Sequence, residues 1–166
     1  MPADGLLHPA AIGALGLLVL NDHVLKAAWP GIVTGKLSDA AGLVLLPLVL
    51  QAGWELARSV IGRDWGPSPR VLVAAVVITG VGFALAKTLE PAADAYRIGF
   101  GILQWPAAAL LAVVRSAPIP DVIPVAFVRD PGDLVTLPAL LIPFVVGRRR
   151  VDPHERRPDE PQADAA

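Results

Sequence analysis

The sequence contains no cysteine and no excess of basic residues. Its 166 residues include 14 Lys and Arg against 15 Asp and Glu, which gives a formal net charge of −1. Without thiols the chain cannot form a disulfide, a thiolate zinc site, an iron–sulfur cluster or a cysteine nucleophile. Without a basic field it has little to attract nucleic acid, so we expect no nucleic-acid partner.

Charged residues are scarce, and motifs that identify an enzyme are missing. Only 17% of the residues are charged, compared with roughly 25% in an average soluble domain. No nucleophile elbow, phosphate-binding loop or HExxH pattern occurs, and His8, His23 and His154 are widely separated. We therefore expect no catalytic residue, no metal and no cofactor, with an enzymatic role as the least favoured function.

Apolar residues are abundant and fall into long runs. Hydrophobic residues make up 54% of the chain, and the mean hydropathy is +0.58. A helix needs roughly 17–25 apolar residues to cross the hydrocarbon core, and the candidate spans are 9–28, 40–61, 71–90, 97–115 and 133–148. The runs are continuous rather than alternating with period two, so helices are favoured over a barrel.

The predicted fold is an all-α integral membrane bundle of about five transmembrane helices, with four to six compatible. The bundle covers 1–150 and is followed by a charged, proline-containing tail, 151–166, that we expect to be disordered. The first apolar run lacks a basic leader and a cleavage pattern, so we expect it to be retained. Residues 116–133 carry four prolines, which favours an interfacial or re-entrant segment over a sixth span.

Lysine and arginine counts near the span ends predict the orientation. With five spans, one side holds nine of them: Lys26, Lys36, Lys87, Arg97, Arg148, Arg149, Arg150, Arg156 and Arg157. The other side holds Arg58, Arg63, Arg70, Arg115 and Arg129. This imbalance predicts an external N-terminus and a cytoplasmic C-terminus in a cell membrane, the plasma (inner) membrane being the expected one.

Polar residues interrupt the end of the first span. Asn21, Asp22, His23 and Lys26 are costly within a bilayer unless they face protein or water. Asp22 and Lys26 are one helical turn apart with the acid first, so we predict that they pair. The simpler alternative is that this group snorkels to the headgroups at the span end, with Trp29 as an interfacial anchor.

The stretch GKLSD, residues 35–39, follows directly. Ser38 is a natural N-cap for the second span, and Asp39 in the first turn complements the helix dipole, but this leaves Lys36 unexplained. The stretch GKLSDAAG is similar to the cytoplasmic-loop motif of the major facilitator superfamily, in which two glycines, a leucine and an aspartate precede a basic pair. Leu43 and Val44 stand where that pair would be, and a carrier of about twelve spans does not fit this chain length.

A second charged stretch, residues 86–97, joins the third and fourth predicted spans. In a five-span topology its charges lie on the same side as those of the first loop. One hypothesis is a shared vestibule, made of Asp22, His23, Lys26, Lys36, Asp39, Lys87, Glu90, Asp94 and Arg97. The alternative is two ordinary loops with local pairs, such as Lys87 with Glu90. Glu55 and Arg58 are expected to form another local pair.

Three functions are compatible with these patterns. The leading hypothesis is binding or translocation of a small ion or solute at the polar cluster, with Asn21, Asp22, His23, Lys26, Lys36, Ser38, Asp39, Lys87, Glu90 and Asp94 as candidate binding residues. The second is a membrane-embedded accessory or scaffold subunit for a protein partner. The third is an intramembrane acid–base enzyme. Expected partners are the lipid bilayer and either a second copy or another membrane protein.

Overall fold

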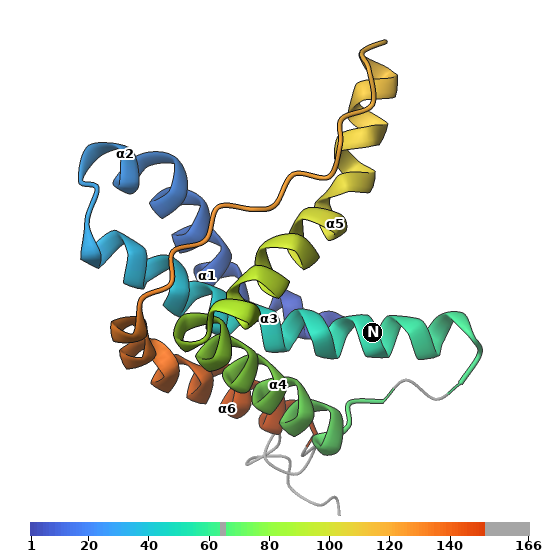
Figure 1. The fold of residues 1–166 in the computed structure, drawn as a ribbon. Coiled ribbons are helices and arrows are strands. Elements are labelled where there is room, and N and C mark those ends of the chain that lie inside the picture. The colour runs from blue at the N-terminus through green and yellow to red at the C-terminus, as the bar shows by residue number, and fades with distance from the viewer. Residues whose placement is uncertain (64–65, 152–166) are drawn as a thin grey trace, which may run out of the picture. The chain divides into compact units, whose positions relative to one another are not determined.

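A computed structural model describes residues 1–63 and 66–151, and all regular elements in these ranges are helical (Figure 1). They are η1 Asp4–Leu7, α1 Pro9–Leu20, η2 Asn21–Leu25, α2 Lys26–Ala28, α3 Ile32–Val60, α4 Pro69–Thr88, α5 Glu90–Val114, η3 Pro131–Leu140 and α6 Leu141–Val151. The predicted all-α class is confirmed for this part of the chain. The tail expected to be disordered lies almost entirely outside the described residues.

Within the described residues, 1–63 and 66–151, five helical stretches are long and apolar enough to cross a membrane. They are Pro9–Ala28, Ile32–Val60, Pro69–Thr88, Glu90–Val114 and Pro131–Arg150. The first has the bounds expected from the sequence, and the number of five is as predicted. Pro9 at the first helical position and His8, whose Nδ1 accepts from the Ala10 amide at 3.1 Å, start this helix.

The second helix begins earlier than the sequence suggested. It starts at Ile32 rather than at residue 40, so Ser38 lies inside α3 and is not its N-cap. Gly31 occupies that position, and its amide donates to Thr34 Oγ1 at 3.2 Å. The stretch 35–42, which resembles a transporter loop motif, is therefore helix, because its polar side chains can face a neighbouring helix instead of ending this one.

The fourth helix also begins earlier than expected, at Glu90 rather than at residue 97. Leu89 is extended, and Glu90 and Pro91 then supply the acidic first turn and the early proline that favour a helix start. The expected third loop is therefore reduced to about one residue. Hydropathy missed this start because the first turns carry charges. The fifth stretch begins at Pro131 as a 3₁₀ helix and continues as α6.

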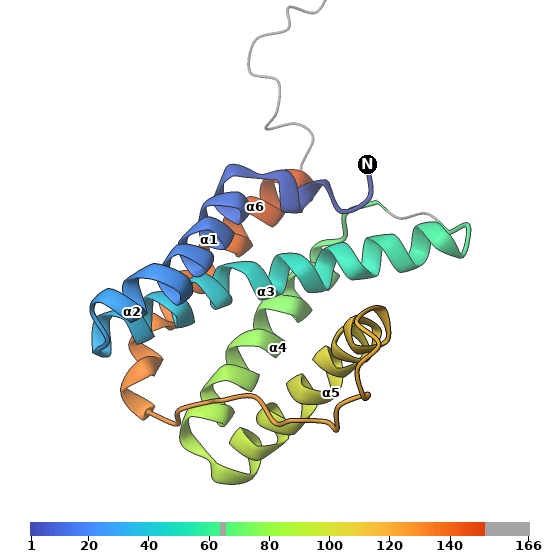
Figure 2. The ribbon, with the colours of Figure 1, turned by 90° about the horizontal axis from the view of Figure 1, so that it is seen from above.

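The chain divides into two compact units, and the first comprises residues 1–80 and 135–166. In this unit α1 lies antiparallel to α3, and α6 contacts both (Figure 2). Ala11, Leu48 and Val146 form the buried centre, with Leu6 and Leu45 packed against it. The small side chain of Ala11 lets α1 approach closely, the usual means of helix packing without large apolar interfaces.

The second unit comprises residues 81–134 and is built on α5. After α5 ends, residues 117–130, which we name the returning segment, form no helix and run back along α5 (Figure 1). Trp105 Nε1 donates to the Pro120 carbonyl oxygen at 2.7 Å, and the Val125 amide donates to the Arg97 carbonyl at 3.0 Å. The expectation that this proline-rich stretch is not a straight helix is confirmed.

Gly101 allows the returning segment to lie directly on α5. A Cβ at this position would be 2.5 Å from the Ile123 carbonyl oxygen and 3.3 Å from Pro124 Cα. Any side chain here would therefore collide with backbone. The residues of α5 that meet the segment, Arg97, Gly101 and Trp105, are spaced by four, so they share one face of the helix.

Candidate functional site

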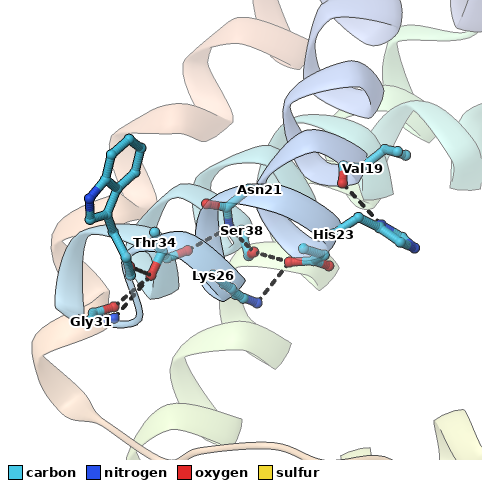
Figure 3. Close-up of polar contacts among 9 residues, drawn as sticks. Val19, Asn21, His23, Lys26, Gly31, Thr34 and Ser38 are labelled. Carbon is cyan, nitrogen blue, oxygen red and sulfur yellow. Dashed lines mark hydrogen bonds and ion pairs between the residues drawn. The ribbon is translucent and has the colours of Figure 1, made fainter.

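The polar residues at the end of the first apolar stretch gather where α1 runs into α2 and faces α3 (Figure 3). Residues Asn21–Leu25 form one π-helical turn, closed by the Lys26 amide bonding to the Asn21 carbonyl. Such turns are rare and are frequently found at functional sites. We name the group formed by Asn21, Asp22, Lys26, Thr34 and Ser38 the hairpin cluster.

Asn21 is the buried member of the hairpin cluster, with no exposed surface. Its Nδ2 donates to the Thr34 carbonyl oxygen and to Ser38 Oγ, both at 2.6 Å. Ser38 Oγ in turn donates to Asp22 Oδ1 at 2.7 Å, so it must accept from Asn21. Both neighbours of the Asn21 amide are acceptors, which is why its NH₂ end faces them. Asn21 Oδ1 is buried and has no hydrogen-bond partner among the described residues.

Asp22 and Lys26 form the ion pair predicted from their spacing. Lys26 Nζ lies 2.7 Å from Asp22 Oδ1, and the two side chains are 42% and 41% exposed. Ser38 and Lys26 therefore bond to the same carboxylate oxygen. The other oxygen, Oδ2, has no hydrogen bond or ion pair in the described ranges, and the Asp22 side chain as a whole is partly exposed.

The turn that leads into α3 is fixed by Thr34. Its hydroxyl lies 2.9 Å from the Gly31 carbonyl oxygen and 3.3 Å from that of Trp29. Thr34 itself is buried, whereas Trp29 is 72% exposed. The same residue, Thr34, supplies the backbone carbonyl oxygen that accepts from Asn21. The contacts that start α3 therefore also position this part of the hairpin cluster.

The remaining candidates of the first unit lie outside this hydrogen-bond chain. His23 is exposed, and its Nδ1 lies 3.0 Å from the Val19 carbonyl oxygen of its own helix. Lys36 and Asp39 are half-buried on α3, one turn apart. Of the three consecutive polar residues 21–23, the structure thus turns only Asn21 fully inward.

In the second unit, Lys87 is the centre of a buried charged group. Its Nζ lies 2.7 Å from Asp133 Oδ2 and donates to the Val128 carbonyl oxygen at 3.3 Å. The ammonium also lies 4.8 Å from the Phe127 ring centroid and 5.4 Å from that of Phe83, distances typical of cation–π contacts. The sequence suggested Glu90 as the partner of Lys87, and the distant acid Asp133 was missed.

Glu90 and Asp94 pair with arginines rather than forming an open acidic site. Arg97 Nη1 lies 2.6 Å from Asp94 Oδ1 and 3.3 Å from Glu90 Oε1. Arg129 Nε lies 2.8 Å from Glu90 Oε2. Arg97 Nη2 also donates to the Phe127 carbonyl oxygen at 3.1 Å, so these pairs fasten the returning segment to the start of α5.

Sequence reasoning missed a third charged group, centred on Glu55. This side chain is only 1% exposed, and its two oxygens lie 3.3 Å from the Arg150 guanidinium nitrogens. Glu55 also accepts from the Ala3 amide at 2.9 Å, and Arg150 pairs with Asp4. The structure thus gives Glu55 a different partner from the expected Arg58, whose guanidinium lies over Trp54 at 5.8 Å. The available signal was an acid within an apolar part of α3, since such a group requires a cationic partner.

The candidate residues therefore fall into separate groups. Asn21, Asp22, Lys26 and Ser38 meet in the first unit, and Lys87, Glu90 and Asp94 belong to the second. Their union in one vestibule remains a prediction. No group of three or more His, Cys, Asp or Glu side chains that could hold a metal ion occurs within residues 1–63 and 66–151. Comparison with known protein families, curated proteins and solved structures finds no match for the chain.

Proposed function

We propose that this chain is an integral membrane protein that binds a small monovalent cation or ammonium-bearing solute at the hairpin cluster. Membrane insertion is supported by the five apolar stretches and by their exposed side chains, such as Ile12 and Leu15 on α1 at 56% and 53%. Soluble monomers rarely expose large contiguous apolar patches. Lipid is the medium in which such surfaces are stable.

The positions of two tryptophans support the same proposal. Trp29 and Trp54 are 72% and 47% exposed; Trp29 lies in the turn just before α3, and Trp54 lies near the far end of that helix. Ile32, the first residue of α3, precedes Trp54 by 22 residues, which is about 33 Å along the helix axis. The hydrocarbon core is about 30 Å thick, and tryptophans are enriched at its two interfaces.

The observation that carries the binding proposal is the pair of unused oxygen atoms on adjacent residues of the π-helical turn. Asn21 Oδ1 is buried without a described partner, and Asp22 Oδ2 lacks one on a partly exposed side chain. Neutral and anionic oxygens are the ligands that small hard cations prefer. Lys26 neutralises the carboxylate in the structure, and a bound cation would compete with its ammonium for the same group.

Ser38 and Thr34 give this site its rigidity. The Asn21 amide nitrogen donates to both residues, and the Ser38 hydroxyl donates to Asp22 Oδ1, which holds the remaining oxygens of Asn21 and Asp22 in defined positions. Ionisable groups within membrane spans are, by default, functional candidates, because burying them is costly. The alternative, in which these side chains only extend toward the lipid headgroups, accounts for the exposed Lys26 but not for the fully buried Asn21.

The test is cation binding by the purified chain in lipid nanodiscs. Sodium, potassium and ammonium chloride are exchanged for one another at a fixed total chloride concentration, which keeps the ionic strength constant, and thermal unfolding is followed. A ligand at 100 times its Kd stabilises the folded state by about 2.7 kcal/mol. We expect one of the three cations to raise the unfolding temperature.

Matched acid variants localise the effect. Asp22→Asn should abolish the cation-dependent shift, whereas Asp94→Asn, which changes an exposed acid in the other unit, should retain it. The absence of a shift with all three cations, or equal loss in both variants, would refute the proposal. Recovery of a stoichiometric protein partner from native membranes, without cation binding, would favour the accessory-subunit alternative.

A further inference from the structure

We infer that the returning segment is a sixth, non-helical traverse of the membrane that faces water, and that the N-terminus and the end of α6 consequently lie on the same side. This inference rests on the membrane insertion proposed above but not on cation binding. It departs from the orientation expected from the lysine and arginine counts.

The returning segment is antiparallel to α5 and long enough to match it. Its contacts with α5 run in reverse order: Pro120 meets Trp105, Ile123 approaches Gly101, and Phe127 meets Arg97. Fourteen extended residues reach about 46 Å. The 25 residues of α5 measure about 37 Å, and the hydrocarbon core is about 30 Å thick. If α5 crosses the membrane, the segment crosses back.

Contacts hold the segment to the helices at its far end. Lys87 pairs with Asp133, directly after the segment, and Tyr96 lies against Phe127 with ring centroids 4.5 Å apart. The Arg129 guanidinium donates to the Thr88 carbonyl oxygen at 3.2 Å. These contacts place the end of the segment beside the turn between α4 and α5, which is the opposite end of α5 from Arg115.

The backbone of the segment requires water. Prolines at 118, 120 and 124 have no amide hydrogen, and the Val125 amide bonds to Arg97. The amides of Ile119, Val122 and Ile123 have no acceptor among the described residues. An unsatisfied amide in hydrocarbon costs several kcal/mol, so non-helical backbone at this depth persists only against protein or a water-filled cavity.

The first unit independently indicates an even number of crossings. The Ala3 amide and the Asp4 carboxylate meet Glu55 and Arg150 at one end of this unit. Arg150 is in the last turn of α6, so the start of the chain and the end of the last described helix lie together. Five helical crossings would separate them, whereas five helices and one extended crossing bring them to the same side.

Single cysteines provide the test, because the chain has none of its own. A membrane-impermeant thiol reagent is applied to sealed vesicles of both orientations carrying one cysteine each. Leu7→Cys and Arg149→Cys should react from the same side, and Ile32→Cys should react from the opposite side. Reaction requires a thiolate in water, so the lipid-facing control Leu110→Cys on α5 should be slower by on the order of tenfold.

Two positions in the returning segment complete the design. Ile119→Cys should react from the side of Leu7, and Val128→Cys from the side of Ile32. Reaction of both from one side would show an external loop and overturn the inference, as would opposite sides for Leu7 and Arg149. Rapid reaction of Leu110→Cys from both sides would instead refute membrane insertion itself.

Discussion

The fit between Gly101 and the returning segment gives the sharpest prediction. In Gly101→Ala the new Cβ would lie 2.5 Å from the Ile123 carbonyl oxygen. Carbon and oxygen atoms in ordinary contact are about 3.3–3.6 Å apart, so the segment must move by about 1 Å. Hydrogen bonds from Trp105 to Pro120 and between Val125 and Arg97 hold it on both sides of the contact.

The expected cost follows from this geometry. Overpacking of this kind destabilises by about 1–3 kcal/mol, while replacing a helical glycine by alanine contributes about 1 kcal/mol of helix stability. Gly99→Ala is the matched control, because it lies on the same helix and an added Cβ meets nothing within 4 Å. Both variants gain the same helix stability from alanine. Their unfolding free energies should therefore differ only by the cost of overpacking at Gly101, about 1–3 kcal/mol.

Chemical denaturation in detergent measures this difference, and trypsin cleavage after Arg129 reports on the segment itself. We expect Gly99→Ala to be stabilised with unchanged cleavage. Gly101→Ala should be less stable than this control and should be cut faster at Arg129. Equal unfolding free energies with equal cleavage would refute the packing of residues 120–127 on α5.

Three further predictions concern the ion pairs. Neutralising Asp22 or Lys26 alone should reduce the amount of protein in membranes more than neutralising both, because each single change leaves an uncompensated charge. Equal levels for the single and double variants would show that the ion pair does not stabilise the protein in the membrane. Lys87→Met or Asp133→Leu should each destabilise by about 3–5 kcal/mol, and the double variant should recover most of the loss, as measured in a double-mutant cycle. Glu55→Leu should destabilise the chain because Arg150 keeps only Asp4 as an acidic partner and the Ala3 amide loses its acceptor. Glu55→Gln, which keeps hydrogen-bonding capacity, should cost less, and identical unfolding midpoints for the two variants would contradict the buried pairing.

Local sequence patterns were sufficient for several features. Continuous apolar runs predicted the helical class and five helices long and apolar enough to cross a bilayer, because this length and apolarity are properties of each segment alone. The pairing of Asp22 with Lys26 followed from the fixed geometry of one helical turn. The prolines of 116–133 excluded a straight helix there, since proline removes backbone donors wherever it stands.

Other features depended on contacts that no local pattern contains. Asn21 is buried and Ser38 lies within a helix only because α1 and α3 pack side by side and satisfy each other's polar groups. Lys87 and Asp133 are 46 residues apart, and Glu55 and Arg150 are 95 apart. Such pairs are fixed by the path of the chain, because buried charges must find partners wherever the fold brings them together. The sequence determined the apolar parts of the five long helices, and the tertiary structure decided where two of them begin, which charges neutralise one another and in which direction the chain returns along α5.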